Sequence, residues 1–456
     1  MREDTNNKDM DTAKALLSEG SSFYARGRWE MALAAYDEVI RKFEDTKDPL
    51  LREQVAKAFL GKQAILRDIG RMEESFNICN DIVKKFSATQ NDLLREVVAN
   101  ALVEKAHLLN DFKRFDEAIV IYNDVIHKFE NEQNPPFREL VAKALIGRGL
   151  TLYKLNRLED ALTTYNDVIN TFEKKETSSF RELVANALIS KGLCLDKLGK
   201  QEEAIAVFDD VISTFSHMKG LTFRELVAKA MINKGFSFGE LGQWDKALIT
   251  YNQVISSFED EELLENRSLR QVIATVLVGK GLCLRKLGHP EEAIAVFNKV
   301  IHLFEDDHEL ALREQVAKAL FGKSFSLSQL NRREEEIATL DELIKRFTIA
   351  KEFSLRKWVA KALFNKGNAN GQLGLFEKAI ATFDDLILEF GEERELSLRE
   401  QVAKALLGKG VILSEQGRHK DAATVYHKVI HKFEAAQDPS LREAVTRARE
   451  WLASIP

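Results

Sequence analysis

One stretch of this chain, residues 181–215, reads RELVANALISKGLCLDKLGKQEEAIAVFDDVISTF. From Leu183 to Leu198 the apolar residues recur at three- and four-residue steps, which is typical of an amphipathic helix. Gly199 follows at the place where a left-handed residue can end a helix without steric cost. A second apolar stripe begins at Ala204. The stretch therefore predicts a longer helix A, a tight turn and a shorter helix B.

The same pattern recurs along nearly the whole chain. A phenylalanine near the end of each predicted helix B recurs every 43 residues, with one step of 46, in the series Phe43, Phe86, Phe129, Phe172, Phe215, Phe258, Phe304, Phe347, Phe390 and Phe433. Arginines keep the same steps, in the series Arg52, Arg95, Arg138, Arg181, Arg224, Arg270, Arg313, Arg356, Arg399 and Arg442. The three extra residues therefore lie between Phe258 and Arg270. Self-similarity at this period indicates a repeat array.

The positions that shape each helix pair repeat as well. The residue after helix A is one that tolerates the left-handed conformation in all repeats but that of Lys113, and these residues are Gly27, Gly70, Gly199, Gly242, Gly288, Gly374, Gly417, Asn156 and Asn331. Glycines recur inside helix A as Gly20, Gly149, Gly192, Gly235, Gly281, Gly367 and Gly410, and alanines in helix B as Ala32, Ala118, Ala161, Ala204, Ala247, Ala293, Ala379 and Ala422. A glycine inside a helix costs about 0.5–1 kcal/mol relative to alanine. Its recurrence therefore predicts close packing of A against B.

Two helices of this length cannot bury both apolar faces alone, so neighbouring pairs must stack. The sequence predicts an all-α solenoid of ten helix pairs over residues 10–440, without a Pro-, Gly- or Ser-rich linker. Residues 1–9 are expected to be a polar tail, and residues 441–456 a capping helix. Each recurring phenylalanine is expected to bury on the next helix A.

A row of polar residues lies in the middle of helix B, where Asp and Asn are poor helix formers. Its members are Asp37, Asn80, Asn123, Asn166, Asp209, Asn252, Asn298, Asp341 and Asp384. We expect these side chains to bond to a Lys or Arg of the following helix A.

The repeat resembles the tetratricopeptide repeat family. Its large, Gly, large, Ala, aromatic, small signature is matched by Leu188, Gly192, Leu195, Ala204, Phe208 and Val211. The family's usual unit of 34 residues is extended here by nine residues around a Leu-Arg-Glu segment, so the chain is similar to the longer tetratricopeptide-like arrays of bacteria, with about 42 residues per repeat. The resemblance implies a right-handed superhelix whose concave face, formed by the A helices, binds a peptide or a partner protein.

Composition and residue spacing argue against several classes of protein. The chain has 66 Lys and Arg against 72 Asp and Glu, a net charge of -6, which argues against a general nucleic-acid binder. The cysteines, Cys79, Cys194 and Cys283, lack the paired spacing of disulfides or zinc sites. Neither a signal peptide nor a membrane span is indicated. We therefore expect a cytoplasmic protein that does not bind membranes.

No catalytic constellation is evident, and we expect a non-enzymatic protein without a cofactor or metal. Gly322-Lys323-Ser324 ends like a phosphate-binding loop, but Ala317 stands where that motif needs glycine. His427 and His431 are one helical turn apart, without a third ligand nearby in sequence.

Two rows mark the predicted inner face of the A helices. The basic row comprises Lys14, Lys57, Lys143, Lys229, Lys318, Lys361 and Lys404. It is either a ladder for acidic ligand groups or one half of intrahelical pairs with glutamates four residues earlier. The apolar row comprises Leu17, Leu60, Val103, Ile146, Ile189, Ile232, Val278, Phe321, Phe364 and Leu407. It is either buried between repeats, which we favour, or covered by a ligand.

Repeats eight and nine depart most from the pattern. Ser324 replaces the glycine, Glu336 the alanine, Leu340 the aromatic, and Lys357-Trp358 an acidic-polar pair. We predict a partner-binding site there, made of Phe321, Phe325, Phe364, Asn368, Lys361, Lys318 and Lys404. The alternative is neutral drift, with Glu336 turned outward.

The function predicted from these features is a protein-interaction scaffold. A sensor or regulatory subunit of a multiprotein bacterial effector complex remains an alternative, and a self-assembling repeat protein is another. Near-identical repeats favour end-to-end association, so a homo-oligomer is left open.

Overall fold

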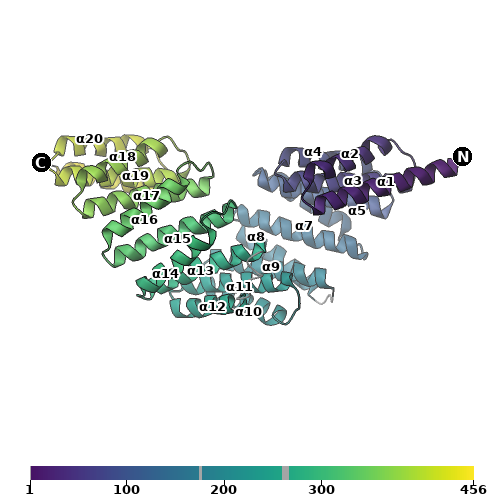
Figure 1. The fold of residues 1–456 in the computed structure, drawn as a ribbon, viewed down its shortest axis with the longest axis horizontal. Coiled ribbons are helices and arrows are strands. Elements are labelled where there is room, and N and C mark those ends of the chain that lie inside the picture. Colours follow the sequence, from purple (N-terminus) through teal and green to yellow (C-terminus); the bar gives the residue numbers. More distant parts are fainter. Residues whose placement is uncertain (1, 174–176, 259–265, 456) are drawn as a thin grey trace. The chain divides into compact units, whose positions relative to one another are not determined.

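The computed structural model of the chain describes residues 2–173, 177–258 and 266–455. Within these ranges the structure contains helices, turns and loops but no strand, and Figure 1 labels the helices where there is room. They are α1 (Arg2–Ala25), α2 (Trp29–Phe43), α3 (Pro49–Asp68), α4 (Met72–Phe86), α5 (Asp92–Asp111), α6 (Phe115–Phe129), α7 (Pro135–Lys154), α8 (Leu158–Phe172), α9 (Ser178–Lys197), α10 (Gln201–Phe215), α11 (Leu221–Glu240), α12 (Trp244–Ser257), α13 (Arg267–Lys286), α14 (Pro290–Phe304), α15 (Leu310–Gln329), α16 (Arg333–Phe347), α17 (Phe353–Gln372), α18 (Phe376–Phe390), α19 (Leu396–Glu415), α20 (His419–Phe433) and α21 (Pro439–Ser454).

Odd-numbered helices from α1 to α19 are the A helices, even-numbered helices are the B helices, and α21 closes the chain. The all-α solenoid of ten helix pairs with a closing helix is thus confirmed for the part of the chain that the structure describes. The A helix α9 has 20 residues and the B helix α10 has 15, as the extension of helix A predicted. The three extra residues predicted between Phe258 and Arg270 fall largely on residues 259–265, outside the described residues.

The helices group into two compact units, residues 1–226 (unit 1) and 227–456 (unit 2). The boundary falls inside α11 and not in a linker. In both units a helix packs on the next one along the chain, and A helices also contact A helices of the neighbouring repeats, for example α5 with α7 and α15 with α17. Each unit is therefore a stack of helices by itself.

Residues 2–9, expected as a tail, belong to α1, which begins at Arg2. Once a helix has formed, each added residue gains a backbone hydrogen bond at little extra cost, so the helix continues into the polar segment. No helix in the described ranges is both long and apolar enough to span a membrane.

Every predicted turn residue after helix A has a positive φ, from Gly27 at 68° to Gly417 at 74°. Asn156 and Asn331 adopt this conformation as well. So does Lys113, at 60°, although its sequence departs from the pattern. The stacked repeats on both sides therefore impose the turn where the local residue does not favour it.

The glycines of the A helices make room for an aromatic ring from helix B. A Cβ atom added to Gly367 would lie 2.4 Å from the ring of Phe383, and one added to Gly408 of the next A helix would lie 2.9 Å from the same ring. Tyr36, Tyr251 and Phe297 lie between two glycines in the same way. The predicted close packing of helix A against helix B is confirmed, and the group of helix B that the glycines contact is the aromatic ring.

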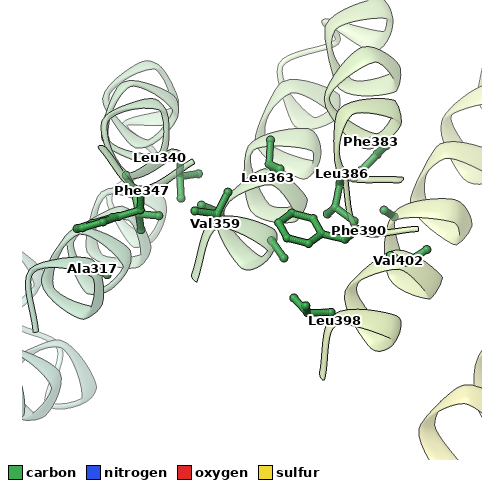
Figure 2. Packing of buried hydrophobic residues seen from close by; sticks show 14 of the residues in the cluster. Ala317, Leu340, Phe347, Val359, Leu363, Phe383, Leu386, Phe390, Leu398 and Val402 are labelled. Carbon is green, nitrogen blue, oxygen red and sulfur yellow. The ribbon is translucent and has the colours of Figure 1, made fainter. Parts of the chain in front are cut away.

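The phenylalanine series is buried throughout the chain, as predicted. Figure 2 shows Phe390 of α18 among Leu363 of α17, Leu386 of α18, and Leu398 and Val402 of α19, all members of one apolar cluster. The ring therefore joins two successive A helices.

The arginine series pairs with the phenylalanine series. The guanidinium of Arg356 lies 5.3 Å from the ring centre of Phe390 and also pairs with Glu393 at 2.7 Å. In the same way, the phenylalanine of the B helix lies under an arginine of the A helix in the same pair for Arg52, Arg95, Arg138, Arg270, Arg313 and Arg399. A cation over a ring face is attracted by the ring's charge distribution. This explains why the two series share one period.

The polar row of helix B bonds to the next A helix where the structure gives its contacts. Lys62 pairs with Asp37, Lys366 with Asp341, and Lys409 with Asp384, each at 2.6 Å. Arg148 donates to the Asn123 side chain at 3.1 Å. The prediction of a bond to a following Lys or Arg is confirmed in these four repeats.

The three cysteines are free and buried. Burial raises the pKa of Cys79 and Cys283 to about 12 and that of Cys194 to about 11. Because the thiolate is the reactive form, we expect a thiol reagent to modify the native chain at least roughly a hundredfold more slowly than the urea-unfolded chain at neutral pH. Mass spectrometry of the labelled chain measures this for each cysteine. Rapid labelling of one cysteine before unfolding would contradict the burial of its repeat.

Candidate functional site

A pocket opens on the A helices of unit 2 and has a volume of about 350 Å³. It is lined by Phe236 of α11, by Thr275, Val278, Leu282 and Arg285 of α13, by Gln315, Lys318, Phe321, Gly322 and Phe325 of α15, and by Trp358 of α17. We call it the aromatic pocket. Four successive A helices contribute because the repeat brings the same helix face to each of them.

The aromatic side chains form one connected surface. Phe321 meets Phe325 edge-on, with 5.0 Å between the ring centres, and it lies 5.1 Å from the centre of Trp358. Phe325 remains 40% exposed, and Phe236 remains 47% exposed. Aromatic rings with this much exposed surface offer a partner a large apolar contact area with little side-chain entropy to lose.

A cation lies at each end of this aromatic surface. The Arg285 guanidinium is 5.6 Å from the ring centre of Phe325. The Lys361 ammonium is 4.4 Å from the ring centre of Trp358 and 6.0 Å from that of Phe321. Lysine 318 also lines the pocket, and none of the lining side chains is acidic. The pocket therefore combines an apolar floor with positive charge.

Both flanking cations are partly removed from water. Burial lowers the pKa of Arg285, whose Nε is buried without a hydrogen-bond partner in the structure. The pKa of Lys361 is lowered by burial first, and then by the nearby charges of Lys357 and Lys404. A buried donor without a partner carries a desolvation cost.

The predicted site residues divide into two groups. Lys318, Phe321 and Phe325 line the aromatic pocket, and Lys361 borders it through Trp358. Phe364, Asn368 and Lys404 do not line it. Phe364 instead lies 6.1 Å from Phe383, between ring centres, and Lys404 is exposed on α19.

Sequence reasoning missed Phe236, Arg285 and Trp358 as pocket residues. Phe236 follows Gly235 as Phe325 follows Ser324, so it occupies the same place in its repeat. That match was available as a signal, and Trp358 already stood out as a departure from the pattern. Arg285 carried no such signal, because arginines are common on the surface of this chain.

Packing accounts for the apolar inner row, whereas the basic inner row is mostly exposed. The apolar row is buried or half-buried at every position, for example Ile232 and Val278, so the favoured interpretation is confirmed. Among the five Glu-to-Lys pairs, all within the described residues, Glu139 and Lys143 form an ion pair, at 3.9 Å. Glu53 instead accepts from Asn91, and Glu400 from Ser440. Intrahelical pairing therefore explains little of the basic row.

Repeat eight is packed differently from the other repeats at the positions where its residues depart from the pattern. Glu336 is only 6% exposed and pairs with Arg333 at 2.7 Å, so the alternative in which it turns outward is wrong. A buried carboxylate needs such a partner. Ser324 lies inside α15, where its hydroxyl donates to the Phe321 carbonyl, as part of the Gly322–Ser324 triplet that resembled a phosphate loop. Among the described residues, no group of three or more His, Cys, Asp or Glu side chains could hold a metal ion.

The fold and these packing rules define a class of helical repeat protein, and comparison with known proteins agrees. Family models described as tetratricopeptide repeat match residues 7–46, 148–217, 229–260, 274–307 and 364–439, together more than half of the chain. The chain belongs to the tetratricopeptide repeat family. None of the curated proteins compared with it matches.

Two solved structures show the same fold. The apo form of the quorum sensor NprR from B. thuringiensis is 14% identical, with 82% of this chain and 98% of that chain covered and a TM-score of 0.54. The apo form of RapI is 13% identical, with 78% and 99% covered and a TM-score of 0.52. At these identities the likeness concerns the fold alone.

Proposed function

We propose that this chain is a non-enzymatic protein-interaction scaffold that holds a peptide or a segment of a partner protein in the aromatic pocket. The observation that carries the proposal is the exposure of Phe236 and Phe325 in the aromatic pocket, where Phe325 contacts the ring of Phe321. The apolar row to which Phe321 belongs is buried or half-buried along the rest of the chain that the structure describes. An exposed cluster of rings in a concave site is the usual form of a binding hot spot.

The family supports the same proposal. Stacked repeats present a long surface on which a chain segment can make contacts to several units. The aromatic pocket is lined by residues of four successive A helices, so an extended segment or a helix can cross them. A role as a regulatory subunit would use the same pocket to recognise its trigger.

The proposal is tested by selecting binders from a random peptide library with the full-length chain. We expect selected peptides to lose at least roughly tenfold in affinity when Phe236 and Phe325 are both replaced by alanine, because the largest apolar contacts are removed. Circular dichroism checks that the double variant stays folded, and fluorescence anisotropy measures affinity.

Leu150 provides a matched control. It stands at the same place in its repeat as Phe236 and is 43% exposed, but it lies in unit 1 and outside the pocket. Leu150→Ala is expected to leave affinity unchanged. A library that yields no binder, or binders indifferent to the Phe236 and Phe325 substitutions, would remove the pocket as the binding site.

A further inference from the structure

The charges around the aromatic pocket narrow the chemistry of its occupant. Arg285 lies over Phe325 at one end of the aromatic surface, and Lys361 lies over Trp358 at the other. Phe321 lies between them, because its ring contacts both Phe325 and Trp358. The apolar floor is therefore flanked by positive charge on both sides.

Neither Arg285 nor Lys361 forms an ion pair with a carboxylate among the described residues, although the charge of Glu400 acts to raise the pKa of Lys361. Four arginines of the repeated series do form such pairs, namely Arg95, Arg270, Arg313 and Arg356. The buried Nε of Arg285 has no acceptor. A guanidinium held in this way is ready to bind a carboxylate through its fork of N–H donors.

We propose that the occupant is an acidic protein segment in which an apolar side chain is flanked on both sides by Asp or Glu. This inference rests on the proposed function and specifies its ligand. The apolar side chain lies on Phe321 and Phe325, and the flanking carboxylates reach Arg285 on one side and Lys361 on the other. A single carboxylate would satisfy one cation only, so the segment needs a carboxylate on each side of its apolar side chain.

The sequences of the selected peptides provide the first test. Among library peptides that depend on Phe236 and Phe325, we expect Asp and Glu to be enriched on both sides of an apolar residue. Their affinity should fall with rising salt, since ion pairs at a partly open site are screened. Neutral or basic peptides whose binding depends on the aromatic pocket would overturn the inference while leaving the proposed function in place.

Substitution of Arg285 provides the second test, with the strongest acidic peptide as the probe. Arg285→Met keeps the apolar stem and removes the charge, so we expect a loss of about 10- to 100-fold in affinity. Arg285→Lys should fall between wild type and Arg285→Met, because it keeps the charge without the fork. Lys286→Met removes the same charge from the next residue, which does not line the pocket, and should change affinity less than about threefold.

The outcomes separate the two claims. Unchanged affinity of Arg285→Met for the acidic peptide would overturn the inference, even where the Phe236 and Phe325 substitutions abolish binding. Absence of any pocket-dependent peptide would instead remove the proposed function, and the inference with it. The inference would also be overturned by acidic peptides that retain full affinity after their flanking Asp and Glu are replaced by Asn and Gln.

Discussion

Replacing Phe390 with alanine is expected to lower the free energy of unfolding by about 3–5 kcal/mol. Its side chain is fully buried among residues of α17, α18 and α19, and the Arg356 guanidinium covers its ring. The substitution removes apolar contacts from two successive A helices and leaves a cavity between them. Urea denaturation followed by circular dichroism measures the shift of the transition midpoint.

Leu388 lies two residues away on the same helix and is 87% exposed. Leu388→Ala is therefore expected to change stability by less than about 0.5 kcal/mol. Stability in a stacked array depends on the interfaces between neighbouring repeats, so the loss in Phe390→Ala should be largest for the repeats around α18. Equal effects of the two substitutions would show that the phenylalanine series does not hold the stack together.

Placing serine at Gly367 is expected to destabilise the chain by about 1–3 kcal/mol, through overpacking against the ring of Phe383. A Cβ atom there would lie 2.4 Å from the ring, which is closer than real contacts allow. Because Phe383 is fully buried, its ring has little room to move away. Urea denaturation of the variant measures the loss.

The preceding repeat suggests how this loss is compensated. There Ser324 takes the glycine position and Leu340 takes the ring position, and both are buried. Adding Phe383→Leu to Gly367→Ser should therefore make the double variant more stable than the sum of the two single changes predicts, by at least about 0.5–1 kcal/mol. Gly374→Ser would not serve as a control, because Gly374 needs a positive φ of 73°. Additive effects would mean that the glycine is not required by the ring.

Much of the fold was predictable because its signals are local. The periods of apolar residues in residues 181–215 located a helix pair, and Gly199 located the turn between them. The contact from the polar row to the next A helix was also predictable. Asp37 and its equivalents recur in the middle of helix B, where Asp and Asn are poor helix formers and a bond to a neighbouring helix explains their presence. Lys113 shows the limit, since its left-handed turn follows from its neighbours and not from its own residue type.

The candidate site was predicted less completely. The chain pattern identified Lys318, Phe321 and Phe325, which line the pocket, but it centred the site on α15 and α17 and extended it to α19. The pocket instead extends toward α13 and α11. Phe364 lies near the ring of Phe383 and does not line the pocket. The direction of a side chain on a stacked helix depends on how the helices cross, which a single repeat does not contain.

The sequence by itself determined the repeat, the helices, the turns between them and the apolar faces that must be buried. These follow from backbone hydrogen bonding and from periodicity within about 20 residues. Only the tertiary structure decided that Arg356 covers Phe390, that a ring lies between two glycines of successive A helices, and that Arg285 and Lys361 flank one aromatic surface. Those relations join residues of different helices, so the spacing and rotation of the stacked helices fix them.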